Sequence, residues 1–379
     1  MACPPTSIHV HFEALEDPRI ERNKRHKLID IMAIAICGVL SGADTWVDIA
    51  EYGKTKAAWL CTFLELPNGI PSHDTFGRVF ARLDPGQLQT CFTDWVQAMF
   101  PHCTTDVIAI DGKTLRRSRD RAGRVPAIHM VSAWAAEQRL VLAQLDVDKK
   151  SNEITAIPDL LTLIDLRGST VTIDAIGCQT AITEQIIAQG GNYVLAVKEN
   201  QPTLYADVQT TLTAMRRESD RRLDEYITEE TGHDRDEIRH YAVTEQIDQV
   251  RGRANWRGLC SIGLVETTQT RNERTTTATR YYISSLPADI GRFSHAVRAH
   301  WGIENRVHWV LDIAFREDES RVRKDHGAKN FAVLRHIAMN LLRHETSRKG
   351  SIKTKRLRTG WDDTYLHMVL GIITPEQDG

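Results

Sequence analysis

The amino-acid sequence predicts a mixed α/β fold: a mixed sheet with a β-rich insertion, preceded by an all-helical N-terminal domain. Two observations predict it. The first hundred residues contain segments of helical apolar spacing. From residue 106, short runs rich in β-branched residues alternate with helical segments in the order β-β-β-α-β-α-β. Because the first three strands follow one another without a helix, the sheet is expected to be mixed rather than doubly wound.

The helical N-terminal domain is expected to span residues 1–100. Residues 27–40 are apolar enough for a buried helix, and residues 45–64 repeat apolar side chains at roughly a helical period. Pro71 and Ser72 indicate the start of a further helix, and Asp84 followed by Pro85 indicates another.

The mixed sheet is expected within residues 101–202 and 281–345. Its strands are predicted at 106–111, 127–136, 140–147, 169–176 and 192–198, with helices at 151–166 and 180–191. Residues 203–280 change this rhythm and are expected to form the β-rich insertion, with a charged helix up to residue 224. Two helices are then expected at 293–315 and 327–345, followed by a basic tail (346–379) with a short apolar helix.

Composition limits the classes of function. No stretch of the 379 residues approaches the roughly 18–20 apolar residues that a membrane span needs, and the N-terminus lacks a signal-peptide pattern. The seven cysteines form no CxxC pair, which favours reduced thiols in the cytoplasm. Net charge is −2, but residues 19–27, 112–124 and 347–358 are basic. Basic clusters are often merely solvated, yet three of them favour a polyanionic partner.

Two predicted strands end in an aspartate: Asp111 in "VIAIDGKTLRR" and Asp174 in "STVTIDAIGC". Each aspartate can simply cap a turn. A phosphate-binding loop would need glycine at Val107, and a DxD phosphatase would need an acid at Ala109, so both of these interpretations fail.

The remaining interpretation is geometric. The first and fourth strands are expected to be parallel neighbours, which places both acids at the same end. Two adjacent carboxylates repel each other unless a cation lies between them. Mg²⁺ prefers carboxylates together with phosphate oxygens, and two such ions can hold both oxygens of an in-line phosphoryl displacement.

A third acid is expected from the helix at 293–315. Apolar residues fall on nearly every face of this segment, which predicts a buried helix with Glu304 in its middle. A buried glutamate needs a partner for its charge, and this partner is either Arg298, His300 or His308, or a metal ion. Asp312 lies about two turns away from Glu304, and Glu317 and Asp318 are expected to be surface or capping charges. The residues behind the expected burial are Val297, Trp301, Ile303, Val307, Val310, Leu311 and Ile313.

The sequence as a whole resembles the DDE transposases of bacterial insertion sequences, in their H-repeat-associated branch. The matching stretches occur in the expected order and cover most of residues 8–345. The N-terminal match runs from Phe12 to Gly53, and the others are "IAIDGKTLR", "KSNEITAIPDLL", "VTIDAIGCQ", "NYVLAVKENQP" and "HWGIENRVHWVLDIAFREDESR".

The resemblance implies a ribonuclease-H-like catalytic domain with Asp111, Asp174 and Glu304 as its catalytic and metal-binding acids. It also implies two Mg²⁺ ions, with Mn²⁺ able to substitute. Water would first cleave a phosphodiester at the element end, and the freed 3′-hydroxyl would then attack target DNA. The partners would be double-stranded DNA, as terminal inverted repeats and as target, and a second copy of the chain in the DNA complex; no membrane is involved, and the location is the bacterial nucleoid.

Residues that contact DNA are harder to assign. Many relatives place Tyr, Arg and Lys around the glutamate where this chain has Val297, His300 and Leu311. This leaves His300, Arg298 and Arg306 as candidates for gripping phosphate. The other expected DNA contacts are Lys113, Arg116, Arg117, Lys198 and, in the insertion, Trp256 stacked on an unpaired base.

Three alternatives stay open. A structure-specific nuclease would use the same acids without joining DNA. A DNA-binding remnant would keep the fold without the chemistry, although the three acids argue against it. A protein-interaction module would bind a DNA column without sensitivity to salt.

Overall fold

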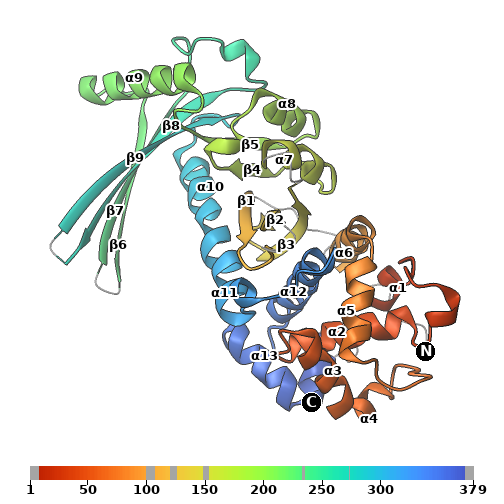
Figure 1. Cartoon of the computed structure of the whole chain (residues 1–379). Helices are drawn as coiled ribbons and strands as arrows, with labels where there is room; N and C mark the ends of the chain where they lie inside the picture. Colours follow the sequence, from red (N-terminus) through yellow and green to blue (C-terminus); the bar gives the residue numbers. More distant parts are fainter. Residues whose placement is uncertain are drawn as a thin grey trace, which may run out of the picture.

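The computed structural model describes residues 8–99, 107–119, 126–147, 153–232, 235–272 and 274–371. Within these residues, one mixed sheet has the strand order β3-β2-β1-β4-β5-β9-β8-β7-β6. A helical body formed from both ends of the chain lies beside the β1–β3 end of this sheet (Figure 1).

The half of the sheet that carries the strand-end acids has the expected topology. Strands β1 (Val107–Leu115), β2 (Ile128–Ala135) and β3 (Leu140–Asp146) are antiparallel neighbours. Strands β4 (Thr170–Ile173) and β5 (Asn192–Val197) continue the sheet parallel to β1. Helices α7 (Glu153–Thr162) and α8 (Thr180–Ala188) provide the connections. This order confirms the predicted ribonuclease-H-like fold.

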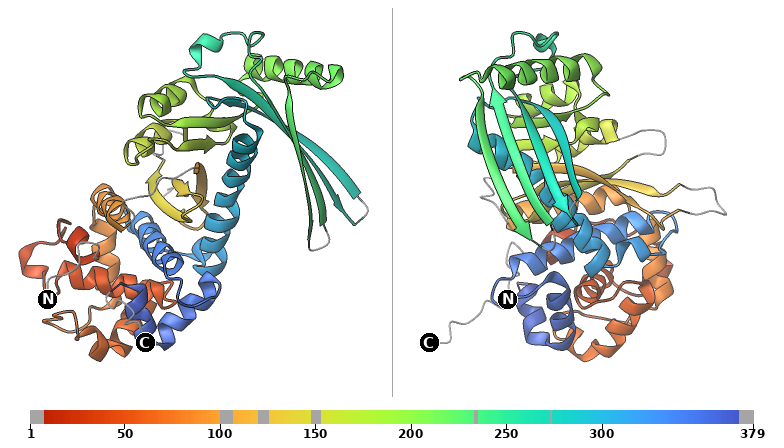
Figure 2. Two further views of the ribbon diagram at one scale, coloured as in Figure 1. Left: turned by 180° about the vertical axis from the view of Figure 1, so that it is seen from behind. Right: turned by 90° about the vertical axis from the view of Figure 1, so that its left-hand side faces the viewer.

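The insertion extends the same sheet. After α9 (Pro202–Glu218), strands β6 (Asp224–Gly232), β7 (Arg235–Thr244), β8 (Ser261–Arg271) and β9 (Arg274–Ser284) form a meander, and β9 pairs with β5. Figure 2 shows these strands reaching beyond the helices. The strand β6 was not expected because its sequence is acidic; the described side chains of β6 are almost all exposed, and backbone pairing with β7 holds it.

The long helix after the insertion differs from the prediction. It consists of α10 (Ile290–Ile303), a π-helical turn (Glu304–His308) and α11 (Trp309–Ala314). The expectation of burial on all faces was wrong: Trp309 is 59% exposed, Ile313 is 50% exposed and Glu304 is exposed. Only one side of α10 packs against β1, β4 and β7, which leaves the other side in solvent.

The helical body combines both ends of the chain. Its N-terminal helices share one hydrophobic core with α12 (Gly327–His344), through residues such as Phe80, Phe92 and Phe331. Side chains of Thr45 and Ser72 cap the starts of two of these helices, as Ser72 was expected to do. The N-terminal helices are α1 (Ile8–Phe12), α2 (Leu28–Leu40), α3 (Trp46–Thr55), α4 (Ala57–Leu60), α5 (His73–Arg82) and α6 (Pro85–Met99).

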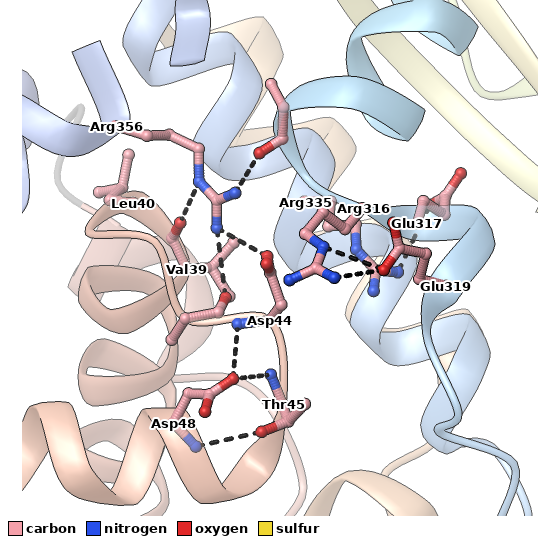
Figure 3. Close-up of polar contacts among 12 residues, drawn as sticks. Val39, Leu40, Asp44, Thr45, Asp48, Arg316, Glu317, Glu319, Arg335 and Arg356 are labelled. Atoms are coloured by element: carbon pink, nitrogen blue, oxygen red, sulfur yellow. Dashed lines mark hydrogen bonds and ion pairs between the residues drawn. The ribbon is translucent and has the colours of Figure 1, made fainter. Parts of the chain in front are cut away.

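The described part of the expected basic tail is folded. It forms α13 (Ile352–Trp361) and α14 (Asp363–Val369), which pack on the helical body. Arg356 is buried and donates hydrogen bonds to the carbonyls of Val39, Ala43 and Ala314 and to Asp44 (Figure 3). This guanidinium is therefore a structural clamp, and it is not available to a polyanion. Among the described residues, no helix is long and apolar enough to cross a membrane.

Candidate active site

Two of the expected acids lie at equivalent positions of neighbouring strands. Ile110 of β1 is paired with Ile173 of β4, and Asp111 and Asp174 follow these two residues directly. The Asp111 carboxylate accepts a hydrogen bond of 2.9 Å from the backbone N–H of Gly112. Asp174 ends its strand and caps the following turn by accepting a bond of 3.2 Å from the N–H of Ile176.

The electrostatics join a third and a fourth acid to this pair. The pKa of Asp111 is raised to about 7, first by burial and then by the charges of Asp174, Glu304 and Glu153, while the Gly112 hydrogen bond opposes the shift. Burial also raises the pKa of Asp174, with Glu153 adding to the effect and Lys198 opposing it. The cluster therefore carries an excess of negative charge that disfavours ionisation.

Glu153 was missed as a member of the site. It lies in the first turn of α7, and its Oε1 is 2.5 Å from Nε2 of His129 on β2. A Cβ atom added to Gly112 would collide with the ends of both side chains, so any larger residue beside Asp111 would displace them. The only sequence signal was that Glu153 lies in one of the stretches that carried the resemblance; its position depends on the packing of α7 against β2.

Glu304 lies on the π-helical turn, where it is exposed, and its charge contributes to the raised pKa of Asp111. One turn further, Nδ1 of His308 is 3.5 Å from Oδ2 of Asp111. The pKa of His308 is lowered to about 4, first by burial and then by the charge of Lys113, so the ring is neutral at pH 7. Because π-helical turns in α-helices are frequent at functional sites, this turn is consistent with a site here.

Lys113 does not lie where a phosphate contact would need it. Its side chain is 12% exposed, and its Nζ lies 2.5 Å from Asp312, 2.9 Å from Glu317 and 3.6 Å from Asp318. The expectation that Lys113 grips DNA was wrong because three carboxylates neutralise it. It instead joins β1 to the segment that follows α11.

Glu317 was also misjudged as a surface charge. It is 4% exposed and lies between Lys113 and Arg335, an arrangement visible for Arg335 in Figure 3. Burial would raise the pKa of Glu317, but the charges of Lys113 and Arg335 outweigh burial and lower it. The glutamate is therefore ionised and structural.

Other expected DNA contacts divide into two groups. Arg116, Arg117 and Lys198 are exposed, although Arg116 is 3.2 Å from Asp318. His300 is half-buried and shares a hydrogen bond of 3.1 Å with Thr172, and burial lowers its pKa to about 4. A neutral ring cannot supply the charge of the arginine that it replaces.

Two further expected contacts have partners inside the protein. Arg298 is exposed but forms an ion pair with Glu230 of β6. Trp256 is 7% exposed and belongs to the same hydrophobic core cluster as Ile262 of β8. Its ring offers no free face to a base, which corrects the expected stacking.

The chemistry of the acids fits a divalent cation. Carboxylate oxygens are the ligands that Mg²⁺ prefers, and a buried Asp111 with a raised pKa gains most from a neighbouring positive charge. Among the described residues, however, no three His, Cys, Asp or Glu side chains are gathered closely enough to hold a metal. The carboxylates are therefore suitable ligands for a divalent cation, but their side chains would have to move closer to one another to bind it.

Comparisons with known proteins give consistent results. One family model, described as DDE_Tnp_1-associated, matches residues 9–96, and a second, described as Transposase DDE domain, matches residues 102–341. The H repeat-associated putative transposase YhhI of Escherichia coli (strain K12) is 37% identical over 365 residues, which cover 95% of this chain and 96% of the relative. The putative transposase YncI of Escherichia coli O157:H7 is 37% identical over 368 residues, 96% and 94% of the two chains.

Two further matches are less complete or more distant. An uncharacterized protein in the dhlA 3′ region of Xanthobacter autotrophicus is 47% identical over 281 residues, 73% of this chain and 94% of the relative. A solved structure of the piggyBac transposase synaptic complex with hairpin DNA superimposes with a TM-score of 0.40 and 11% identity, over 95% of this chain and 77% of that chain.

Proposed function

Because the chain belongs to the transposase DDE domain family, in its H-repeat-associated branch, we propose that it cuts DNA at the ends of its own element and joins those ends to target DNA. The observation that supports this most is the register of Asp111 and Asp174 on neighbouring parallel strands, with Glu304 in the same electrostatic cluster.

We assign Asp111, Asp174 and Glu304 as ligands of two Mg²⁺ ions, for which Mn²⁺ can substitute. Such ions would stabilise the charge on the attacking and leaving oxygens of an in-line displacement. A carboxyl must lose its proton to act as a ligand, and the pKa of about 7 makes this loss accessible to Asp111 near neutral pH. The neutral His308 ring, 3.5 Å from Asp111, orients that carboxylate.

The proposed substrate is double-stranded DNA, as terminal inverted repeats and as target. The exposed Lys198 is close enough to Asp174 to lower its pKa and can contact a phosphate beside the acids. The exposed Arg116 and Arg117 follow the end of β1 and can contact phosphates farther along the DNA. We further propose that the helices of residues 1–100 bind DNA, that two copies act together in the DNA complex, and that the protein works on the bacterial nucleoid.

The proposal is tested with the full chain and a duplex that ends in the DNA flanking its coding sequence. We expect nicking at the element end and joining to a target plasmid in Mg²⁺ or Mn²⁺, and neither in excess EDTA. Nicking without joining would favour the structure-specific nuclease. Salt-dependent DNA binding without nicking in either metal would favour the DNA-binding remnant.

A further inference from the structure

A cavity of about 630 Å³ lies directly beside Glu304. One wall is the π-helical turn, with Glu304 and Arg306. The turn between β2 and β3 contributes Arg139, and the insertion strands contribute Glu230 and Arg239. The cavity therefore lies where the proposed third acid, the catalytic sheet and the insertion meet.

The positive charges on the insertion side are balanced within the protein. Arg239 lies 3.3 Å from Glu230 and also pairs with Glu237, and Arg298 pairs with the same Glu230. The guanidinium of Arg239 stacks on the ring of Trp301 with its Cζ 4.8 Å from the ring centre. This side is held together by its own ion pairs.

Three arginines gather where the β2–β3 turn meets the π-helical turn: Arg139 and Arg306, which line the cavity, and Arg343, which contacts the backbone of both. Arg343 of α12 donates a hydrogen bond of 3.2 Å to the carbonyl of Arg139 and another to the carbonyl of Arg306. Its guanidinium lies over the ring of Trp134, 4.4 Å from the ring centre. Arg139 and Arg306 are exposed and line the cavity.

This arginine cluster, Arg139 with Arg306 and Arg343, lacks a counter-charge. Within the described part of the chain, no carboxylate forms an ion pair with any of the three. The pKa of Arg343 is lowered to about 9 by burial together with the charges of Arg139 and Arg306. Like charges held together by backbone hydrogen bonds favour the binding of an anion between them.

We infer that the arginine cluster binds a backbone phosphate of the DNA strand on the β2–β3 side of Glu304. This inference rests on the proposed function, because it takes DNA as the source of the phosphate. Arg306 and Glu304 line the same cavity, so a phosphate held by Arg306 belongs to a nucleotide near the reacting one. The exposed Arg139 and Arg306 contact the phosphate, since their guanidinium forks match its oxygens. Arg343 is a positioning residue that fixes the backbone of both.

The test compares Arg139→Gln/Arg306→Gln with Arg167→Gln in the full chain. Arg343 is left in place because its packing on Trp134 makes misfolding a risk. Arg167 is a suitable control because it is exposed and precedes β4, at the end of that strand opposite Asp174, and Arg167→Gln removes one positive charge, as each of the two substitutions in the double variant does. The measurement is affinity for the duplex from the flanking DNA as a function of salt, followed by nicking at saturating DNA.

We expect the slope of log affinity against log salt to become shallower by about 0.9 for each phosphate that the double variant no longer neutralises. Affinity at fixed salt should fall on the order of tenfold per arginine, and nicking at saturating DNA should fall by less than the affinity does. Arg167→Gln should behave as the unmodified protein.

An unchanged slope in the double variant would overturn the inference while leaving the proposed function intact. So would equal reductions of affinity in the double variant and in Arg167→Gln. Inorganic phosphate binding that the double variant loses, without any change in DNA affinity, would show a site for free anions and would also contradict it. Failure of the unmodified protein to bind or nick the duplex would instead count against the proposed function.

Discussion

Asp111 and Asp174 lie in register on two neighbouring parallel strands, each directly after a member of the pair Ile110 and Ile173. Two carboxylates so placed repel each other, and this repulsion adds to the cost of burial at Asp111. The protein retains an arrangement that costs stability when no cation is present, which is expected of a site that binds one.

The first prediction concerns these two acids. Asp111→Asn or Asp174→Asn should abolish nicking and joining, because each removes a ligand. Neither should lower the free energy of unfolding in metal-free buffer, because each also removes a repulsive charge. Nicking assays and urea unfolding of the same preparations measure both effects. Wild-type nicking rates in either variant would contradict the assignment.

The second prediction concerns pH. The pKa of Asp111 is raised to about 7 by burial and by neighbouring acids, whereas in the unfolded chain it lies near its ordinary value of about 3.9. The folded state then binds this proton more tightly, so its contribution to stability is full below about pH 4 and is lost as pH rises through about 7. In EDTA, wild-type stability should therefore fall over this range relative to Asp111→Asn, by up to a few kcal/mol. If the free energies of unfolding of the two proteins changed with pH in parallel, the pKa of Asp111 would not be raised in the folded state.

The third prediction concerns Lys113, which is 12% exposed among Asp312, Glu317 and Asp318. Lys113→Gln should lower the free energy of unfolding by about 3–5 kcal/mol, because the buried Glu317 and the partly exposed Asp312 and Asp318 all lose this counter-charge. The nearby Arg116→Gln is a matched control; its side chain is 78% exposed, so its pair with Asp318 should contribute less than about 1 kcal/mol. Urea unfolding measures both losses of stability. Equal losses in the two variants would show that the burial of Lys113 does not strengthen its ion pairs.

The fourth prediction concerns the clamp at Arg356. Arg356→Met should leave the carbonyls of Val39, Ala43 and Ala314 without their donor, at a cost of about 1–3 kcal/mol for each that stays unsatisfied. Amide hydrogens of α13 should exchange faster as a result. The exposed Lys353 on the same helix provides the control variant Lys353→Gln, which should exchange as the unmodified protein does. Unchanged exchange in Arg356→Met would show that other contacts hold α13.

The sheet and its two acids could be predicted from the sequence because strand patterns are local. A β-branched run ending in Asp111, repeated at Asp174, was sufficient to predict parallel strands with both acids at one end, and the pairing of β1 with β4 confirms it. The strand β6 was missed because it lacks such a local pattern. Its acidic side chains show no apolar alternation, and only its pairing with β7 defines it as a strand.

The surroundings of the acids depend on tertiary packing and could not be predicted. Glu304 was expected to be buried from the apolar residues around it, but α10 packs on the sheet with one side only. Lys113 was expected to contact DNA, yet the segment after α11 folds back and encloses it with Glu317. Glu153 reaches the site through the packing of α7, which no local pattern shows.

The most direct test of the proposed site is single-turnover nicking and joining of the element-end duplex in Mg²⁺ by Glu304→Gln and Asp312→Asn. Asp312 is the matched control because it is an acid of the same helical segment whose carboxylate is 2.5 Å from Lys113. Lys113 keeps Glu317 as a partner when Asp312 is replaced. Glu304→Gln should fold normally and show neither nicking nor joining, whereas Asp312→Asn should retain measurable activity. Joining of DNA ends by Glu304→Gln, or the absence of activity in Asp312→Asn alone, would show that the third acid of the site is not Glu304.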